Sequence, residues 1–309
     1  MKPSAVNAEQ EMRETARKLL EGKQVGVVVG YARGTASMRS TPAFIRDAKD
    51  ADRLIFNSTC GISLAPHLRK ALRSVPKGTK AAVVAKGCDG RALVQYIVEG
   101  QLTRDDVVII GIACDGAVDR RKAEGGKREA GSIDVAEAGR EVLSDSCLRC
   151  RYPNPPVYDA LVAEPRDAGS GDEYAEVAEF ERLGADERWA WFERELAKCI
   201  RCYACRNACP MCYCEECFVD QTNPQWFGKS AEQPDTMMFH IVRALHTAGR
   251  CVDCGACERA CPLGVRLGLL NKRIEREVKE RFGYTAGLSL DMKPAMAAYD
   301  EEDRQEFIL

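Results

Sequence analysis

Two short cysteine runs with the same spacing are the part of this chain most able to do chemistry. Each run has three cysteines separated by two residues, then, after three intervening residues, a fourth cysteine followed by proline. Thiolates at this spacing hold [4Fe–4S] clusters, and the fourth cysteine of each run ligates the other cluster. The runs are Cys199-x2-Cys202-x2-Cys205-x3-Cys209-Pro210 and Cys251-x2-Cys254-x2-Cys257-x3-Cys261-Pro262.

Crossed ligation of this kind predicts two complete sets of four thiolates. A zinc site is the alternative, but zinc takes two close cysteine pairs and would leave one thiol of each quartet unused. The spacing is that of bacterial ferredoxins, so the predicted chemistry is single-electron transfer. The first set is Cys199, Cys202, Cys205 and Cys261, and the second is Cys251, Cys254, Cys257 and Cys209.

Two loop cysteines and a CxxC pair predict a third cluster. Cys88 and Cys114 each follow a predicted strand, and Cys147 and Cys150 form the CxxC pair. The carboxyl ends of parallel strands share one edge of a sheet, where α/β folds place their sites. The alternative is that Cys88 and Cys114 are small buried hydrophobic residues. We expect these four thiols to hold a [4Fe–4S] cluster.

The four remaining cysteines are Cys60, Cys212, Cys214 and Cys217. The last three are one thiolate short of a cubane, and Cys60, at a predicted strand end, could supply the fourth. Because sixteen thiols divide into four complete sets, our hypothesis is a fourth cluster between the two halves of the chain. The alternative is that Cys212, Cys214 and Cys217 are structural thiols, or that they contact the ligands of another cluster without binding its iron.

The elements that must position these cysteines differ between the two halves. In residues 24–115, short apolar runs alternate with helical patterns, which predicts an α/β domain with a largely parallel sheet. The expected strands are Val25–Val29, Arg53–Phe56, Ala81–Ala85 and Val107–Ile112, and the expected helices are Leu64–Leu72 and Arg91–Glu99.

The predicted domains are an α/β domain at 1–155, a linker at 156–185, a mainly α-helical ferredoxin-type dicluster domain at 186–283, and a tail at 284–309. The charged, Gly-rich segment Asp119–Ser132 is predicted to be a surface excursion. The tail could lie over its own domain or over a partner. Helices expected in the second half are Asp186–Lys198, Met237–Leu245 and Val265–Arg281.

Composition indicates a redox protein of a reducing compartment. The net charge is -2 and 45% of residues are hydrophobic, so nothing indicates nucleic-acid binding. The first residues lack the apolar core of a secretory signal, and no apolar run reaches the ~18–20 residues that cross a bilayer. Sixteen cysteines without such a signal predict metal ligands rather than disulfides. We therefore expect a cytoplasmic location.

Three motifs resemble a known family. The chain from Val25 to about Tyr158 is similar to the catalytic beta subunit of coenzyme F-420-reducing hydrogenases and related formate dehydrogenases. The motifs are VVAKGCDGRAL (Val83–Leu93), VVIIGIACDG (Val107–Gly116) and CLRCRYPNPPVYD (Cys147–Asp159). The resemblance implies an α/β fold of that kind and cluster ligands at Cys88, Cys114, Cys147 and Cys150.

The same resemblance implies FAD and hydride exchange with a deazaflavin. The chain departs from the family at two places. The charged segment Glu9–Leu20 replaces a Gly-Gly-containing opening helix, and Lys86-Gly87 stands where a proline usually precedes the first cluster cysteine. The sequence therefore leaves FAD open.

The whole chain resembles a bacterial subset of that family in which the beta-subunit-like domain is fused to a ferredoxin module. Such proteins accompany heterodisulfide-reductase-like flavoproteins, formate dehydrogenases or hydrogenases in anaerobes. The resemblance implies an iron–sulfur electron-transfer subunit that relays single electrons between a partner dehydrogenase or hydrogenase and a flavin-bearing subunit. The alternative is an FAD-containing oxidoreductase subunit that itself converts a hydride into single electrons.

Other residues carry weaker signals. The loop Gly30–Thr35, with Arg33, could approach a flavin phosphate, although such a turn is more often only a turn. Lys86, Asp89 and Arg91 flank Cys88 and could tune a cluster or orient a flavin, or could be solvated loop charges. A structural role is favoured for the three histidines, and the sequence predicts no catalytic residue. These histidines are His67, His240 and His246.

Overall fold

The computed structural model describes residues 5–36, 38–124, 139–297 and 301–302. Its N-terminal half is built on a five-stranded sheet with the strand order β2-β1-β3-β4-β5. β2 runs antiparallel to β1, and the other neighbours are parallel. The strands are β1 (Val27–Arg33), β2 (Ser40–Ile45), β3 (Ala81–Ala85), β4 (Val107–Ile112) and β5 (Ala160–Val162).

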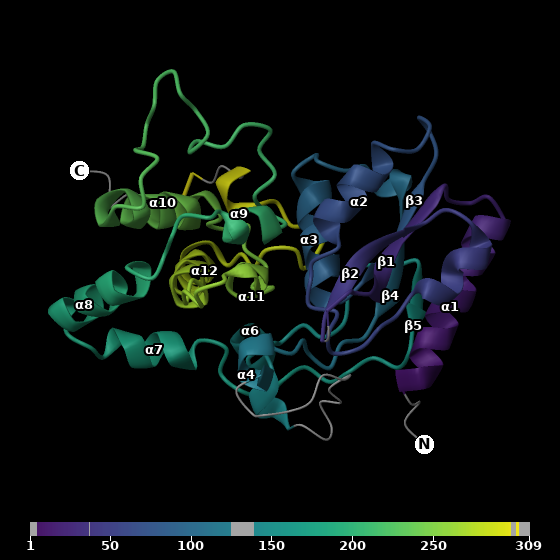
Figure 1. The fold of residues 1–309 in the computed structure, drawn as a ribbon, viewed down its shortest axis with the longest axis horizontal. Helices are drawn as coiled ribbons and strands as arrows, with labels where there is room; N and C mark the ends of the chain where they lie inside the picture. Colours follow the sequence, from purple (N-terminus) through teal and green to yellow (C-terminus); the bar gives the residue numbers. More distant parts are fainter. Residues whose placement is uncertain (1–4, 37, 125–138, 298–300, 303–309) are drawn as a thin grey trace.

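Helices lie on both faces of this sheet (Figure 1). Every residue of β3 is buried, as expected for a central strand of a parallel sheet covered on both faces. α1 lies on one face, where it fully buries Met12 and Ala16, and α2 and α3 lie on the other. The helices of this half are α1 (Ala5–Glu21), η1 (Ala48–Arg53), α2 (Ala65–Leu72), α3 (Gly87–Val98), η2 (Arg104–Asp106), α4 (Arg120–Glu124), η3 (Arg140–Val142) and α6 (Asp145–Leu148).

The predicted strands of the sheet centre agree with β3 and β4, and the two predicted helices overlap α2 and α3. The strand predicted at Arg53–Phe56 is wrong. Arg53 is the last residue of η1, and Ile55 forms one antiparallel bridge, to Tyr31. The strand at the edge of the sheet beside β1 is instead β2, whose mixed polar and apolar sequence hid it from the pattern.

The hairpin of β1 and β2 corrects the prediction of a loop at Gly30–Thr35 and bears on its possible contact with a flavin phosphate. Gly30 to Arg33 belong to β1, and Arg33 pairs with Ser40 across the hairpin. Strand pairing therefore uses the backbone groups that a flavin phosphate would need.

The second half contains the predicted helices. Those expected at Asp186–Lys198, Met237–Leu245 and Val265–Arg281 overlap α8, α10 and α12. Two five-residue helices, α9 and α11, lie inside the two cysteine runs and pack against each other. The helices are α7 (Ala175–Glu181), α8 (Ala185–Leu196), α9 (Ala204–Ala208), α10 (Gln233–His246), α11 (Ala256–Ala260), α12 (Gly268–Phe282) and η4 (Ala295–Ala297).

The segment predicted as a linker, 156–185, is only partly a connection. Its first part supplies β5, which pairs with β4, and its later part forms α7. The three residues of β5 are too short a run to stand out in the sequence. Of the predicted surface excursion, α4 is described, whereas residues 125–132 lie outside the described residues, as do 298–300 and 303–309 of the tail.

Buried polar contacts join the two halves. Arg91 on α3 is 3% exposed and donates to the carbonyl oxygens of Ala286, at 3.0 and 2.9 Å, and Val252, at 3.1 Å. The Tyr284 hydroxyl donates to the side-chain oxygen of Gln95 at 2.9 Å. The start of the tail therefore lies against α3 of its own chain.

Candidate metal centres

The two cysteine runs fold into the same backbone turn. Arg201 and Tyr203 in the first run have φ values of 52° and 59°, and Asp253 and Gly255 occupy the equivalent places in the second with 48° and 65°. Successive amides in such left-handed turns point into one concavity, which suits an anionic cluster. In the first run, the Arg201 amide donates to the Cys199 sulfur at 3.3 Å.

The first predicted set of thiols is gathered at one cavity. His240 on α10 and Phe239 contribute to the same wall. The His240 ring Nε2 lies 3.3 Å from the Cys199 sulfur, and the Val265 amide donates to the Cys261 sulfur at 3.3 Å. Cys261 of the opposite run thus lies at the same cavity as the three cysteines of the first run. The cysteines that line this cavity are Cys199, Cys202, Cys205 and Cys261.

The second set is centred on Cys209. Burial raises the pKa of the Cys251, Cys254 and Cys257 thiols, and the neighbouring Cys209 raises all three further. The neighbouring Cys212 thiol is the main cause that lowers the pKa of Cys209. Cys209 thus lies with the three cysteines of the other run.

The third set lines a larger cavity, of about 500 Å³, at the carboxyl ends of β3 and β4. Cys88 lies in the first turn of α3 and Cys114 follows β4, while Cys147 and Cys150 come from α6 and the residues after it. The amides of Gly116 and Ala117 donate to the sulfurs of Cys114 and Cys147, each at 3.3 Å. Burial is the main cause that raises the pKa of Cys114 to about 12.

A buried ion pair forms one wall of this third cavity. Lys86 Nζ lies 2.9 Å from the Asp89 carboxylate, and the side chains are 4% and 0% exposed. Burial, the largest single cause, lowers the pKa of Lys86, but Asp89 together with Tyr31 and the thiols of Cys88 and Cys114 raises that pKa above its usual value. Asp89 also accepts hydrogen bonds from Ser63 Oγ at 2.8 Å and the Leu64 amide at 3.0 Å. Tyr31 completes the network by hydrogen bonding to Lys86. Lys86 is therefore a fixed cation beside Cys88 and Cys114, and not a solvated loop charge.

Two arginines that sequence reasoning missed lie among the thiols. Arg259 donates to the Cys254 carbonyl at 2.7 Å. The charges of the Cys147, Cys254 and Cys88 thiols contribute most to raising its pKa, against the effect of burial. Arg243 is 4% exposed and donates to the Cys205 carbonyl at 3.3 Å. Of these two arginines, only Arg259 could have been expected near the thiols from the sequence, because it stands inside the second cysteine run.

These features fit iron–sulfur clusters. Each of the three sets supplies four thiolates, the ligands of a [4Fe–4S] cluster, and cations such as Lys86, Arg243 and Arg259 offset the negative charge of cluster and thiolates. Amide-to-sulfur hydrogen bonds act in the same direction. Within the described part of the chain, no three His, Cys, Asp or Glu side chains are gathered as ligands of one metal ion.

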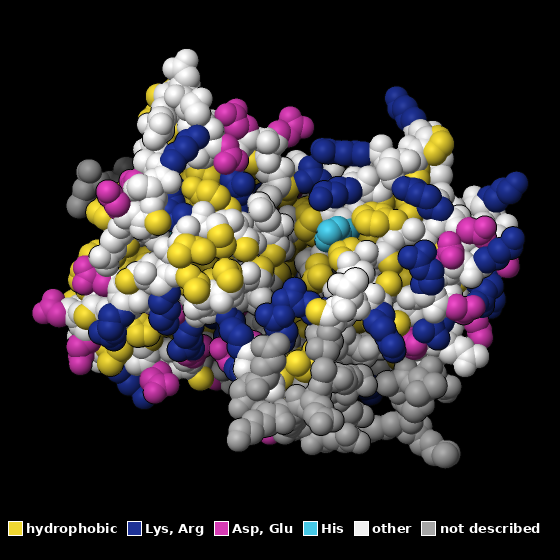
Figure 2. Space-filling view, viewed as in Figure 1, with side chains coloured by type: hydrophobic (Ala, Val, Ile, Leu, Met, Phe, Trp, Pro, Cys, Tyr) yellow, Lys and Arg dark blue, Asp and Glu magenta, His cyan; other side chains and the backbone are white. Residues whose placement is uncertain are grey.

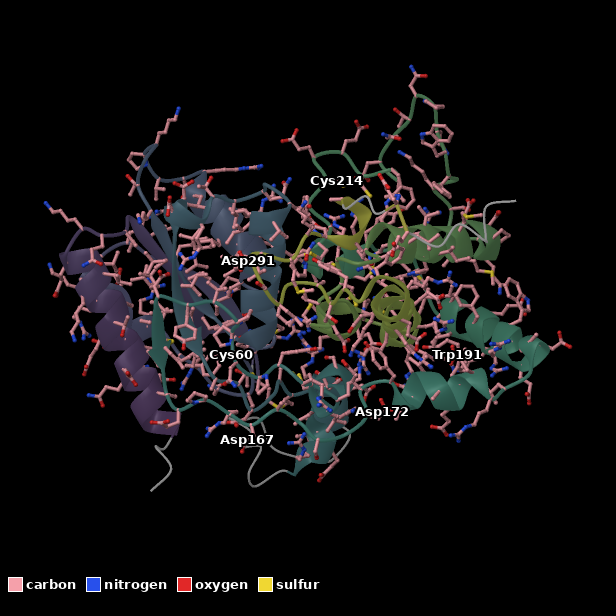
Figure 3. The ribbon with its side chains drawn as sticks, turned by 180° about the vertical axis from the view of Figure 1, so that it is seen from behind. Cys60, Asp167, Asp172, Trp191, Cys214 and Asp291 are labelled. Carbon is pink, nitrogen blue, oxygen red and sulfur yellow. The ribbon has the colours of Figure 1, made fainter. Side chains whose placement is uncertain are left out.

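The structure does not bring the proposed fourth set together. Cys60 is 1% exposed in the core of the α/β half, with its sulfur 3.9 Å from the Ile55 carbonyl oxygen. Cys212 lies against Cys209, Cys217 packs in the dicluster half beside Arg206, and Cys214 is exposed. Figure 3 shows Cys60 and Cys214 well apart. The contacts of Cys60 therefore give the fourth set no support, and that cluster stays a prediction.

The three remaining sets are contiguous. Cys254 of the second set lines the same cavity as the third set. Cys205 of the first set and Cys257 of the second lie on α9 and α11, which pack against each other. The second set therefore borders both of the others.

Fold and site thus define a class, an iron–sulfur protein with an α/β domain joined to a dicluster module. A family model described as a 4Fe-4S dicluster domain matches residues 195–265. The "F420-dependent formate dehydrogenase subunit beta" of Methanocaldococcus jannaschii is 22% identical, over 89% of this chain and 91% of that protein. The "F420-dependent formate dehydrogenase 1 subunit beta" of Methanococcus maripaludis is 24% identical, over 90% of each.

These relatives confirm the resemblance predicted from the motifs, over most of the chain and not only the first half. They support an iron–sulfur electron-transfer subunit within a multi-subunit oxidoreductase. Among the described residues, none of the helices has the length and apolar content needed to span a membrane.

Proposed function

We propose that this chain relays single electrons along three [4Fe–4S] clusters, between a partner dehydrogenase and a flavin-bearing subunit. The observation that carries the proposal is that Cys254 of the second set lines the same cavity as Cys88 and Cys114 of the third. It makes the dicluster module continuous with the site on the sheet edge. When bound, such clusters accept and release one electron each.

The protein's own groups would hold the clusters and set their potentials. Hydrogen bonds to sulfur and nearby positive charge favour the reduced, more negative cluster. Lys86 and Arg259 supply positive charge beside the site at Cys88, and Arg243 supplies it in the dicluster module. Burial of these groups keeps their charges unscreened by water.

The names of the relatives support one kind of partner. Two proteins similar to this chain along its length are named as formate dehydrogenase subunits, so we place it in a formate dehydrogenase-type complex. A hydrogenase in place of the dehydrogenase, with a heterodisulfide-reductase-like flavoprotein as the flavin-bearing neighbour, uses the same relay.

Iron, acid-labile sulfide and flavin in anaerobically purified protein test the proposal. Three clusters give about twelve irons and twelve sulfides per chain, since each cubane holds four of each. The iron content of a Cys88→Ser/Cys114→Ser variant should fall to about eight per chain. The signals of the two dicluster sites should persist in its electron paramagnetic resonance spectrum. Stoichiometric FAD on this chain would instead favour an enzyme that splits a hydride. Protein without labile sulfide, or without a paramagnetic signal after reduction, would overturn the relay.

A further inference from the structure

A second large cleft opens between the two halves, beside α2. It has a volume of about 460 Å³. One wall is α2, with His67, Arg69 and Lys70, and Arg73 follows at the end of that helix. The opposite wall belongs to the dicluster module and contains Cys209 and Tyr213. The cleft therefore reaches a predicted cluster ligand directly.

The cations of this cleft fall into two kinds. Arg69 is held in place, because it stacks over the rings of Tyr96 and Tyr213, at 5.5 and 5.0 Å from their centroids, and donates to Gln101 at 3.2 Å. Lys70 and Arg73 are exposed. Within the parts of the chain that are described, no carboxylate is in ion-pairing distance of either. Arg69 thus shapes the wall, and Lys70 and Arg73 offer charge to a partner.

The positive charge extends beyond the cleft. Lys77 and Lys80 are exposed in the connection from α2 to β3. Arg69 and Arg73 also line a neighbouring hollow, whose acidic lining residue is Asp106. Figure 2 shows Lys and Arg side chains gathered over α2 beside hydrophobic side chains. The whole chain carries a net charge of -2, so the positive charge of this face contrasts with the slightly negative charge of the chain.

The wall beside Cys209 is rigid. The Tyr96 hydroxyl hydrogen bonds to the Pro210 carbonyl oxygen, and the rings of Tyr96 and Tyr213 meet edge to face at 5.4 Å. Arg250 pairs with Glu99 at 2.8 Å, and Glu99 also accepts from the Tyr213 hydroxyl. Cys209 would therefore keep a fixed position relative to a partner that docks on α2.

We propose that this cleft docks an acidic one-electron carrier protein and exchanges one electron with the cluster held by Cys209. Charges spread along an exposed helix steer a large partner of opposite sign, and weak electron-transfer contacts need only a small interface. In the step, the carrier loses one electron and the cluster gains it, with no bond formed or broken. The inference rests on the proposed function, because it requires a cluster at Cys209.

The test uses the holoprotein and a reduced bacterial ferredoxin of net negative charge as the probe. Stopped-flow bleaching gives the second-order rate constant of electron transfer at several ionic strengths. We expect that constant to fall as salt rises, and to fall about tenfold or more at low salt in Lys70→Glu/Arg73→Glu. The matched control, Lys18→Glu/Lys49→Glu, changes the charge equally on α1 and η1 and should alter the constant less than about twofold.

Two further measurements separate docking from structural damage. Iron content must equal that of the wild type, and reduction by the cationic methyl viologen radical should not be slowed in the cleft variant, since its charge attracts that reagent. Equal rates with ferredoxin in both variants would overturn the docking site while leaving the relay intact. Inhibition by inorganic pyrophosphate at constant ionic strength, lost in the cleft variant, would also overturn it and assign the cleft to a small anion. A wild type without clusters would instead defeat the proposed function.

Discussion

The guanidinium of Arg259 donates two hydrogen bonds to the Gly61 carbonyl oxygen, from Nε at 3.2 Å and Nη2 at 2.7 Å. Arg259 stands in the second cysteine run, whereas Gly61 follows β2 in the α/β half. The same guanidinium reaches the Cys254 carbonyl and Ser146 Oγ. One cation therefore fixes the two halves together at the point where the second and third thiol sets meet.

Replacing that cation should change reduction potentials. In Arg259→Gln, we expect the potentials of the clusters at Cys88 and Cys254 to fall, because a positive charge that favours the reduced form is lost. At roughly 10 Å and an effective dielectric constant of about 20, the effect is about 1–2 kcal/mol, or roughly 40–90 mV for one electron. Redox titration followed by electron paramagnetic resonance measures it. Arg259→Lys should restore most of the shift, and unchanged potentials in both variants would show that the charge has no such role.

Crossed ligation can be tested by counting iron in combined variants. Cys251→Ser/Cys254→Ser should remove one cluster and leave about eight irons of twelve. Adding Cys209→Ser should then cost no further iron, because Cys209 belongs to the cluster already lost. Adding Cys261→Ser should lower the count to about four, because Cys261 completes the other dicluster site. The reverse pattern would mean that each run holds its own cluster.

Gly87 permits a close approach at the third site. A Cβ atom on Gly87 would collide with the carbonyl oxygen of Tyr152, which lies just after the CxxC pair. Gly87→Ala should therefore displace that segment, destabilise the protein by about 1–3 kcal/mol as overpacking does, and reduce iron by up to about four per chain. Gly171→Ala is the control, because nothing lies within 4 Å of its Cβ position. Equal melting temperatures and iron contents for both variants would contradict this account.

The cysteines outside the three sets should be dispensable for iron. Cys60→Ala leaves a small cavity in the apolar core and should cost about 1 kcal/mol of stability, with the iron content unchanged. Cys214→Ala should change neither quantity, because Cys214 is exposed. Iron and sulfide determination on both variants checks this. Loss of about four irons in either variant would restore a fourth cluster.

Local patterns were enough to predict much of the fold. β3 and β4 were predicted because uninterrupted apolar runs specify buried parallel strands, and α8, α10 and α12 because apolar residues recur at helical spacing. β2 and β5 were not predicted. β2 mixes polar residues and a proline at a sheet edge, and β5 is too short, so each is a strand only because a neighbouring strand pairs with it.

By itself, the sequence was enough to predict the two cysteine runs and the turn that each forms, because the repeated spacing and its turn are properties of a short stretch of backbone. Tertiary structure alone decided that Cys60 is a core residue, that Arg243 and Arg259 lie among the thiols, and that α2 forms a basic wall beside Cys209. Those relationships join segments far apart in the chain. They arise from how the two halves pack, which no local spacing encodes.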